Sequence, residues 1–147
     1  MNLKLPARAD ELVCLRDADR KHDYWTSPGR YVRLAPLVVI RRSVFEEQPP
    51  WEKELLRGVA AARNSLTAVL TGRHAARLWG VSVHSPDASA YRRPVTMVPP
   101  GTAQRTSRRN WPPHVTILGT VLHDEEHSIH QGIRIVTRWR AVRDVIL

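Results

Sequence analysis

The sequence contains one cysteine, one phenylalanine and no apolar run long enough to span a bilayer. The single thiol, Cys14, excludes an intrachain disulfide and favours a reducing compartment. The longest apolar run, Leu37–Ile40, has the length of a strand. The first residues lack a hydrophobic segment followed by a cleavage site. We therefore expect a cytoplasmic protein with no secretory signal and no membrane partner.

Motifs typical of common enzymes are also missing. There is no Gly-x-Ser-x-Gly pattern and no glycine-rich phosphate loop, which argues against a serine hydrolase and against that kind of phosphate site. The stretch His123–His127 has the H-x-x-E-H spacing of one class of zinc peptidase, and His130 could add a ligand. Because Gly119 and Gly132 leave little room for a helix, we expect a solvated acidic turn there. We expect no metal, no cofactor and no enzymatic activity, with a metallopeptidase or a nuclease as the enzymatic alternative.

Acidic residues are few relative to basic ones. Lysine and arginine number 23 against 14 aspartates and glutamates, which gives a formal net charge of +9 and a sequence pI of about 10.9. A strong positive field attracts polyanions, and a pI above about 9 is typical of nucleic-acid-binding domains. The sequence therefore favours double-stranded DNA as a partner, with a basic but inert surface as the alternative.

Residues 1–48 are predicted to form an N-terminal unit. Ala7–Ala18 has the apolar spacing of a short helix. Arg30–Leu34 and Leu37–Ile40 are two β-rich runs separated by Pro36, which predicts a hairpin. A hairpin after a helical region is typical of a winged-helix domain, here in a reduced form.

Residues 49–147 are predicted to form a second unit of helices and strands. The sequence indicates helices near Trp51–Ala62, Gly72–Trp79 and after Thr137, and strands at Pro94–Val98, His114–Leu118 and Ile133–Val136. Two helices are expected to bury apolar stripes: Trp51, Leu55, Val59 and Ala62 in the first, and Trp139, Val142 and Ile146 in the last. The predicted fold class is α+β, a short winged-helix-like unit followed by helices and an antiparallel sheet.

Arginine brackets the predicted hairpin at Arg30, Arg33, Arg41 and Arg42. These side chains could pair with phosphates along a DNA backbone, and each such contact would release counterions. The alternative is a solvated strand face. The preceding segment, Arg16–Tyr24, mixes three aspartates with its basic residues. Because those carboxylates would repel phosphate, we do not expect base reading from that segment.

A second basic stretch, Gln104–Trp111, lies between two predicted strands. It combines Arg105, Arg108 and Arg109 with hydroxyl and amide side chains and a tryptophan. Phosphate pairing and aromatic stacking could both contribute to nucleic-acid binding there. The alternative is a flexible charged loop.

A third basic group lies on the helix expected over residues 72–79. Arg73, His74 and Arg77 fall on the side that we expect to be polar. We expect His74 at the surface, and we include Arg73 among the candidate nucleic-acid-binding residues.

The order of these motifs resembles the actinobacterial AbiEi-like antitoxin family, over roughly residues 28–147. The Thr71–Gly80 block is the most specific part of the match. The residues that carry the resemblance are Gly29–Pro36 (GRYVRLAP), the tryptophan-bearing helix of residues 51–62, Ala68–Gly80 (AVLTGRHAARLWG), Pro94–Val98, Arg105–Arg109, the strand from His114, and Gly132–Thr137 (GIRIVT).

The resemblance implies a DNA-binding antitoxin of a type IV toxin–antitoxin pair. Such family members carry an N-terminal winged helix that represses their own operon and a C-terminal antitoxin domain. A sister group fuses the same leading region to a nuclease similar to very-short-patch repair enzymes. By resemblance, Arg30 and Arg33 match the wing, and Arg105, Arg108 and Arg109 match the basic stretch. The region before the hairpin is shorter and more acidic than the family's full helix-turn-helix.

We therefore expect a non-enzymatic transcriptional regulator of antitoxin type that grips duplex DNA through arginine–phosphate contacts. A toxin resembling a nucleotidyltransferase and a second copy of the chain are the candidate protein partners. The alternative is a protein-interaction module that binds a toxin or itself without sequence-specific DNA binding. The apolar residues Val145–Leu147 suggest this alternative, because exposed apolar residues favour cover by a partner.

Overall fold

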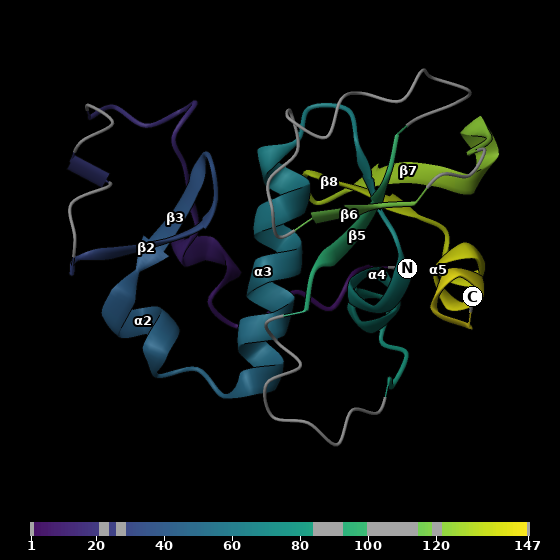
Figure 1. Cartoon of the computed structure of the whole chain (residues 1–147), viewed down its shortest axis with the longest axis horizontal. Helices are drawn as coiled ribbons and strands as arrows, with labels where there is room; N and C mark the ends of the chain where they lie inside the picture. The colour runs from purple at the N-terminus through teal and green to yellow at the C-terminus, as the bar shows by residue number, and fades with distance from the viewer. Residues whose placement is uncertain are drawn as a thin grey trace.

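The computed structural model describes residues 2–20, 24–25, 29–83, 93–99, 115–118 and 122–146. Two β-sheets flank one long helix, α3 (Pro50–Asn64), as Figure 1 shows. Helices and strands are mixed along the chain, so the predicted α+β class is confirmed. Among the described residues, no helix combines the length and the apolar character needed to cross a bilayer.

The first sheet contains the predicted hairpin. Strands β1 (Val13–Cys14), β2 (Tyr31–Ala35) and β3 (Val38–Arg41) form it in the order β1-β3-β2, with both pairs antiparallel. Ala35 pairs with Val38 across the turn, and an irregularity follows Arg33 in β2. The two β-rich runs and the break between them were therefore predicted correctly.

The predicted helix over Ala7–Ala18 is wrong. This stretch forms one short 3-10 turn, η1 (Ala9–Glu11), and then strand β1. Val13 pairs with Val39 of the central strand β3. Leu12–Leu15 is a run of four apolar residues, a pattern that suits a short strand better than one face of a helix. Pairing with β3 therefore outweighs the weak helical spacing.

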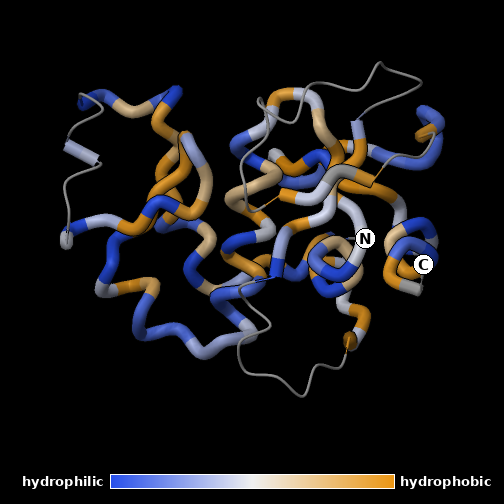
Figure 2. The backbone as a smooth tube through the Cα atoms, in the orientation of Figure 1, coloured by the Kyte–Doolittle hydropathy of each residue, from blue (hydrophilic) through white to orange (hydrophobic). Residues whose placement is uncertain are grey.

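Helix α3 is confirmed, and it is buried on two sides. Its N-terminal Pro50 fits the first turn, where a missing N–H leaves no hydrogen bond unmade. Leu56 and Ala60 belong to the apolar cluster of the first sheet. Leu55 and Val59 belong to the larger cluster under the second sheet. Figure 2 shows the apolar strands of both sheets on either side of this helix.

The second sheet has five strands in the order β6-β5-β4-β8-β7. These strands are β4 (Val69–Leu70), β5 (Val95–Val98), β6 (Val115–Ile117), β7 (His127–His130) and β8 (Ile133–Val136). The pairs β4–β5 and β7–β8 are antiparallel, but β4–β8 and β5–β6 are parallel, so the sheet is mixed and not the antiparallel sheet that was predicted. Strands β4 and β8 each run into a helix, α4 (Gly72–Leu78) and α5 (Arg138–Ile146). Two strand–helix units laid side by side place their strands parallel.

The helices α4 and α5 pack against each other. Gly80 follows α4 with a φ of +85°, a conformation that glycine adopts readily just beyond a helix end. The Thr137 side chain caps α5 by accepting a hydrogen bond from the Arg140 backbone N–H at 3.3 Å. Two shorter elements complete the fold: α2 (Arg42–Glu46) before α3, and the 3-10 turn η4 (Asp124–Glu126) before β7.

Both predicted apolar stripes contain a tryptophan that is exposed. Trp51 is 59% exposed and Trp139 is 77% exposed, so their inward placement is wrong. The side chain of Ile146 lies outside the description. The inner side of α5 instead carries a charged pair, Arg140 and Asp144, whose side chains are 2% and 1% exposed.

This buried pair belongs to a hydrogen-bonded network between α4, α5 and η4. The Arg140 Nε lies 3.1 Å and 3.2 Å from the two oxygens of Asp144, and its Nη1 lies 2.8 Å from Glu126 Oε2. Thr71 Oγ1, just before α4, donates to Asp144 Oδ2. The Arg140 hydrogen bond, aided by the backbone N–H of His123, holds the pKa of Glu126 below its usual value. The charges are thus satisfied inside the fold.

We predict that Asp144→Ala lowers the free energy of unfolding by about 3 kcal/mol, because it removes the buried carboxylate that pairs with the buried guanidinium of Arg140. The double variant Arg140→Met/Asp144→Leu removes both buried charges and should lose less stability than Asp144→Ala alone. Urea unfolding at neutral pH measures both. A double variant at least as unstable as the single one would contradict this view of the network.

Candidate nucleic-acid interface

The outer face of the β2–β3 hairpin presents two of the predicted arginines. Tyr31 pairs with Arg41 and Arg33 pairs with Val39. Because neighbouring side chains of a strand point to opposite faces, Tyr31, Arg33 and Arg41 share one face of the sheet. Both arginines are exposed, whereas Leu34 on the opposite face is buried in the cluster against α3. Packing of the apolar face thus directs these arginines outward.

The other two hairpin arginines lie together at its open end. The Arg42 backbone N–H donates to the Arg30 carbonyl at 3.0 Å, so the two residues are neighbours across the strands. The Arg30 side chain is exposed. The Arg42 Nη1 lies 3.2 Å from Glu46 Oε1, one turn along α2 and also exposed. A surface ion pair of this kind contributes little free energy, so a phosphate could replace the carboxylate.

Aromatic rings hold the arginine side chains at the open end of the hairpin. Tyr24 and Trp25 lie with ring centroids 4.9 Å apart, and Trp25 lies 5.1 Å from Tyr31. The guanidinium of Arg20 lies 4.7 Å from the Tyr24 ring centroid, and that of Arg30 lies 6.0 Å from it. Cation–π contacts of this length restrict the side chains without neutralising their charge. The rings and cations form one cluster, which we call the open-end cluster.

The turn of the hairpin lies at its opposite end, against the C-terminal end of α3. The Leu37 N–H donates to Asn64 Oδ1 at 2.7 Å, and the Leu15 N–H donates to the Leu37 carbonyl at 2.7 Å. The Arg16 guanidinium donates to the Arg63 carbonyl at 3.1 Å. These bonds occupy the turn, so the exposed arginines concentrate at the open end of the hairpin and on its outer face.

Arg73 lies at a different place, between α3 and α4. Its Nε lies 2.8 Å from Glu54 Oε1, and Arg77 Nη1 lies 2.8 Å from the same oxygen. The two arginine side chains are 17% exposed and Glu54 is 2% exposed. Burial tends to raise the pKa of Glu54, but hydrogen bonds from Arg77 and Arg73 outweigh it and hold that pKa below its usual value. Arg73 joins two helices, and its role in DNA contact stays a prediction.

The expected surface position of His74 is wrong. Its side chain is 2% exposed and faces α3 at Gly58, where the Cβ of any larger residue would lie 2.9 Å from His74 Cδ2. Burial lowers the pKa of His74 to about 4, even though the nearby Glu54 carboxylate favours the charged form. The imidazole is therefore neutral at physiological pH. Its Nε2 has no hydrogen-bond partner among the described residues.

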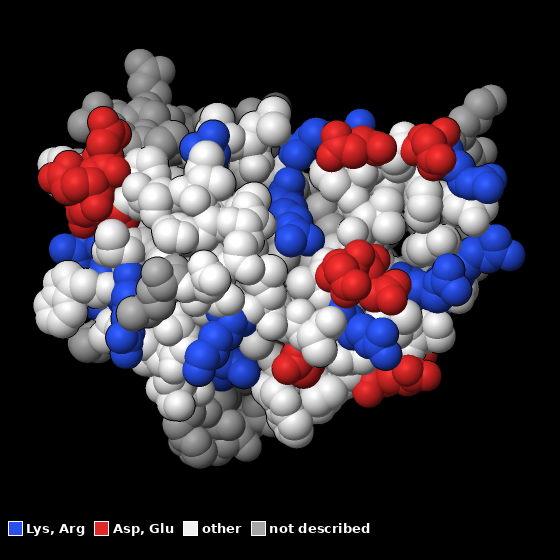
Figure 3. All heavy atoms as spheres, turned by 180° about the vertical axis from the view of Figure 1, so that it is seen from behind, with Lys and Arg blue, Asp and Glu red and all other residues white. Residues whose placement is uncertain are grey.

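The basic stretch with Arg105, Arg108 and Arg109 lies outside the described residues. Figure 3 shows one face of the described part, on which basic and acidic side chains are interspersed. The described part therefore does not carry one continuous basic surface on that face. Of the predicted contacts, the structure brings together Arg30, Arg33, Arg41 and Arg42, and it separates Arg73 from them.

The H-x-x-E-H stretch forms no helix. His123 precedes the 3-10 turn η4, and its backbone N–H donates to Glu126 Oε1 at 3.1 Å. His127 already belongs to β7, and Asp124 and Glu125 are exposed. The predicted acidic turn is thus confirmed. No group of three potential metal ligands is found in the part of the chain that the structure describes.

Two features of this region escaped the sequence analysis. The first is the open-end cluster, which joins the Tyr24–Trp25 pair to Tyr31. The nearness of these three aromatic residues in the sequence could have indicated it. The second feature is Glu54, a carboxylate on the buried side of α3. Arg73 and Arg77 lie four residues apart and so share a helix face, a spacing that could have indicated a common carboxylate partner.

We predict that stability decreases as the pH falls from about 6.5 to about 4, by at most about 3 kcal/mol. In this range the unfolded chain binds a proton at residue 74 that the folded chain excludes, since the folded pKa is the lower one. His74→Leu removes the titrating group, so its stability should change less over that range. Urea unfolding of both proteins at several pH values measures the difference. Parallel pH profiles would show that His74 does not titrate as described.

Comparison of the chain with models of protein families, with curated proteins and with solved structures gave no match. The function therefore has to be argued from the residues and their geometry.

Proposed function

We propose that this protein binds the backbone of duplex DNA through arginine–phosphate contacts, as a non-enzymatic regulator of the antitoxin type. One observation carries the proposal: Arg30, Arg33 and Arg41 are exposed at the open end and on the outer face of one hairpin. Arg42 adjoins them in an exposed ion pair that a phosphate could replace. Guanidinium groups on a rigid strand pair suit a regular anionic ribbon.

The aromatic rings beside these arginines support the same proposal. A long cationic side chain loses rotamer freedom when it binds, which weakens the net interaction. Contact with the Tyr24 ring restricts Arg20 and Arg30 before any ligand arrives. Because a ring also contributes to binding by stacking, Tyr24 adds a second kind of contact for nucleic acid. The cluster therefore favours binding by pre-ordered cations.

The proposed binding reads the DNA backbone more than its bases. A winged helix carries its wing on a small antiparallel sheet, so the three-stranded sheet with its hairpin supports a winged-helix-like mode of binding. The exposed Asp17 and Asp19 lie between β1 and the hairpin, and their charge disfavours insertion of that segment into a groove. We therefore expect modest sequence preference and a steep dependence of affinity on salt.

The antitoxin assignment rests on the family resemblance. Its most specific block, Thr71–Gly80, forms helix α4 with its flanking residues, and the two arginines of the block hold Glu54. These ion pairs explain why the block has arginine at positions 73 and 77. A nucleotidyltransferase-like toxin is the proposed cognate partner, and a gene of that kind beside this one would support the assignment.

We predict that Arg30→Gln/Arg33→Gln/Arg41→Gln weakens binding to duplex DNA and lowers the slope of log affinity against log salt by about 2 to 3, because each lost phosphate contact removes roughly 0.9 from that slope. Fluorescence anisotropy titrations at several salt concentrations measure both quantities.

The matched control is Lys4→Gln/Arg8→Gln/Arg93→Gln, which removes the same three charges from exposed positions elsewhere. It should leave the slope nearly unchanged. A third variant, Arg105→Gln/Arg108→Gln/Arg109→Gln, tests the stretch outside the described residues. If the hairpin variant and the control lost equal affinity and equal salt slope, binding would depend only on the overall charge. That result would refute the proposed interface.

A further inference from the structure

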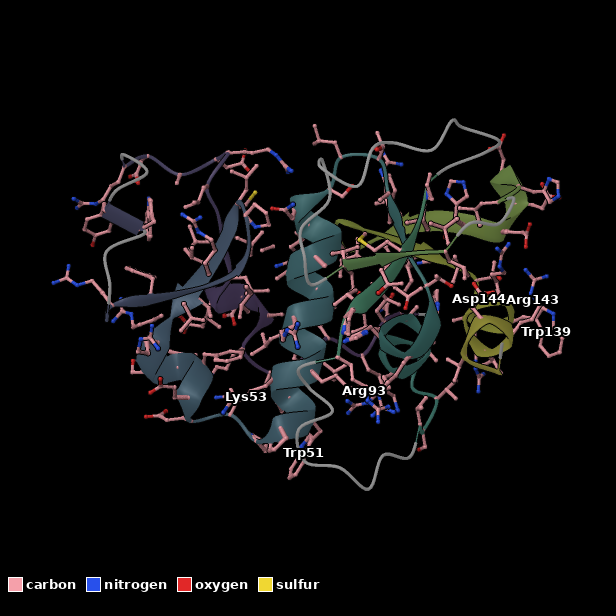
Figure 4. All side chains as sticks on the ribbon, viewed as in Figure 1. Trp51, Lys53, Arg93, Trp139, Arg143 and Asp144 are labelled. Atoms are coloured by element: carbon pink, nitrogen blue, oxygen red, sulfur yellow. The ribbon has the colours of Figure 1, made fainter. Side chains whose placement is uncertain are left out.

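The outward side of helix α5 carries the most exposed large apolar side chain of the described residues. Trp139 is 77% exposed and Val145 is 39% exposed. Figure 4 shows that Trp139 and Arg143 project away from the fold. Arg138 and Arg143 are both exposed, and Arg143, four residues after Trp139, lies beside it on the helix surface.

This arrangement inverts the usual amphipathic helix. The side of α5 that packs on α4 and η4 carries Arg140 and Asp144, both buried. The outward side carries Trp139 and the half-buried Val142, one helical turn away. Apolar side chains at this spacing form the contact stripe of a helix that packs against another element. Trp139 stays uncovered by the described fold, whereas Val142 is partly covered.

Charges of opposite sign adjoin the stripe at its two ends. The turn η4 lies against the first turn of α5, where the Thr137 N–H donates to the Glu126 carbonyl at 2.8 Å. This turn presents the exposed carboxylates of Asp124 and Glu125. Arg143 lies in the last turn of α5, at the other end. Figure 3 shows the acidic group and the neighbouring basic side chains at one end of the molecule.

We propose that α5 is a self-association surface, on which a second copy of this chain docks with its own α5 antiparallel to the first. A two-fold axis that passes near Trp139, in the first turn of α5, brings the two Trp139 side chains together. It also places Arg143 of each copy beyond the first turn of the other helix, on the side of η4. Arg143 of each copy meets the acidic turn Asp124–Glu125 of the other, so one patch supplies both halves of the charge pairing.

The size of the surface sets the strength of this association. Helix α5 has 9 residues, and 9 residues of helix span about 14 Å. Such a contact is smaller than a standard stable interface, so we expect dissociation constants in the micromolar range. An aromatic anchor surrounded by charges is typical of the centre of such interfaces.

The association is independent of the proposed DNA contact. Figure 1 places α5 at one end of the molecule and the β2–β3 hairpin at the other. The two hairpins of a dimer would therefore both stay accessible. Failure of DNA binding would leave the self-association intact, and the reverse also holds.

Sedimentation velocity over about 1 to about 300 μM protein tests the proposal, because this range brackets a micromolar dissociation constant. We expect a concentration-dependent rise from monomer to dimer. Trp139→Ser should weaken association at least tenfold, whereas the control Trp51→Ser, at another exposed tryptophan, should not change it. Circular dichroism checks that each variant is folded.

Charge reversal provides the sharper test. Arg143→Glu should weaken the dimer, and Asp124→Lys/Glu125→Lys introduced into the same chain should restore it, because the exchanged charges again face each other across the two-fold axis. A protein that stays monomeric at every concentration overturns the proposal, and the occupant of this face would then be a different protein. A dimer that survives Trp139→Ser, or charge reversal that is not rescued, also overturns it.

Discussion

The burial of α3 on two sides is the constraint on which the rest of the structure depends. One side, with Leu56 and Ala60, packs against the hairpin sheet, and the other, with Leu55 and Val59, packs against the five-stranded sheet. Neither sheet could bury its apolar face without this helix, and each fixes the orientation of the other through it. The hairpin is thereby held with Arg33 and Arg41 on the side away from α3, so a mainly apolar interaction determines where these arginine side chains are exposed.

The positive charge of the chain serves two different purposes. Some arginines stabilise the fold: Arg73 and Arg77 share the buried carboxylate of Glu54, and Arg140 joins Asp144 and Glu126. These guanidinium groups offset buried carboxylates and contribute little to the outer field. The hairpin arginines stay exposed, on a surface of mixed charge. The net charge of +9 therefore overstates the cationic surface, and position decides which arginines can meet a polyanion.

The sequence predicted the elements whose pattern is local and failed where long-range pairing decides. The hairpin and the helices α3 and α4 follow from alternation, apolar spacing and turn residues. The strand at Val13–Cys14 exists because β3 offers it a partner, which no local pattern could show. The stripe with Trp139 was placed inward because apolar spacing usually marks a core. A charged network between Arg140, Asp144 and Thr71 took that position instead, through residues far apart in the sequence.

For the candidate site, the sequence indicated the hairpin arginines, but only the fold showed that they are grouped with Tyr24 and Trp25.

The proposed contact between duplex DNA and the open end of the hairpin can be tested by spectroscopy. The five tryptophans supply separate reporters, because each indole N–H gives its own signal in a proton–nitrogen correlation spectrum. In a titration with duplex DNA, the indole signal of Trp25, which packs edge-on against Tyr24 and Tyr31, should shift, while those of Trp51 and Trp139 should stay unchanged. A spectrum in which the Trp25 signal stays fixed while that of Trp51 or Trp139 moves would contradict the proposed contact.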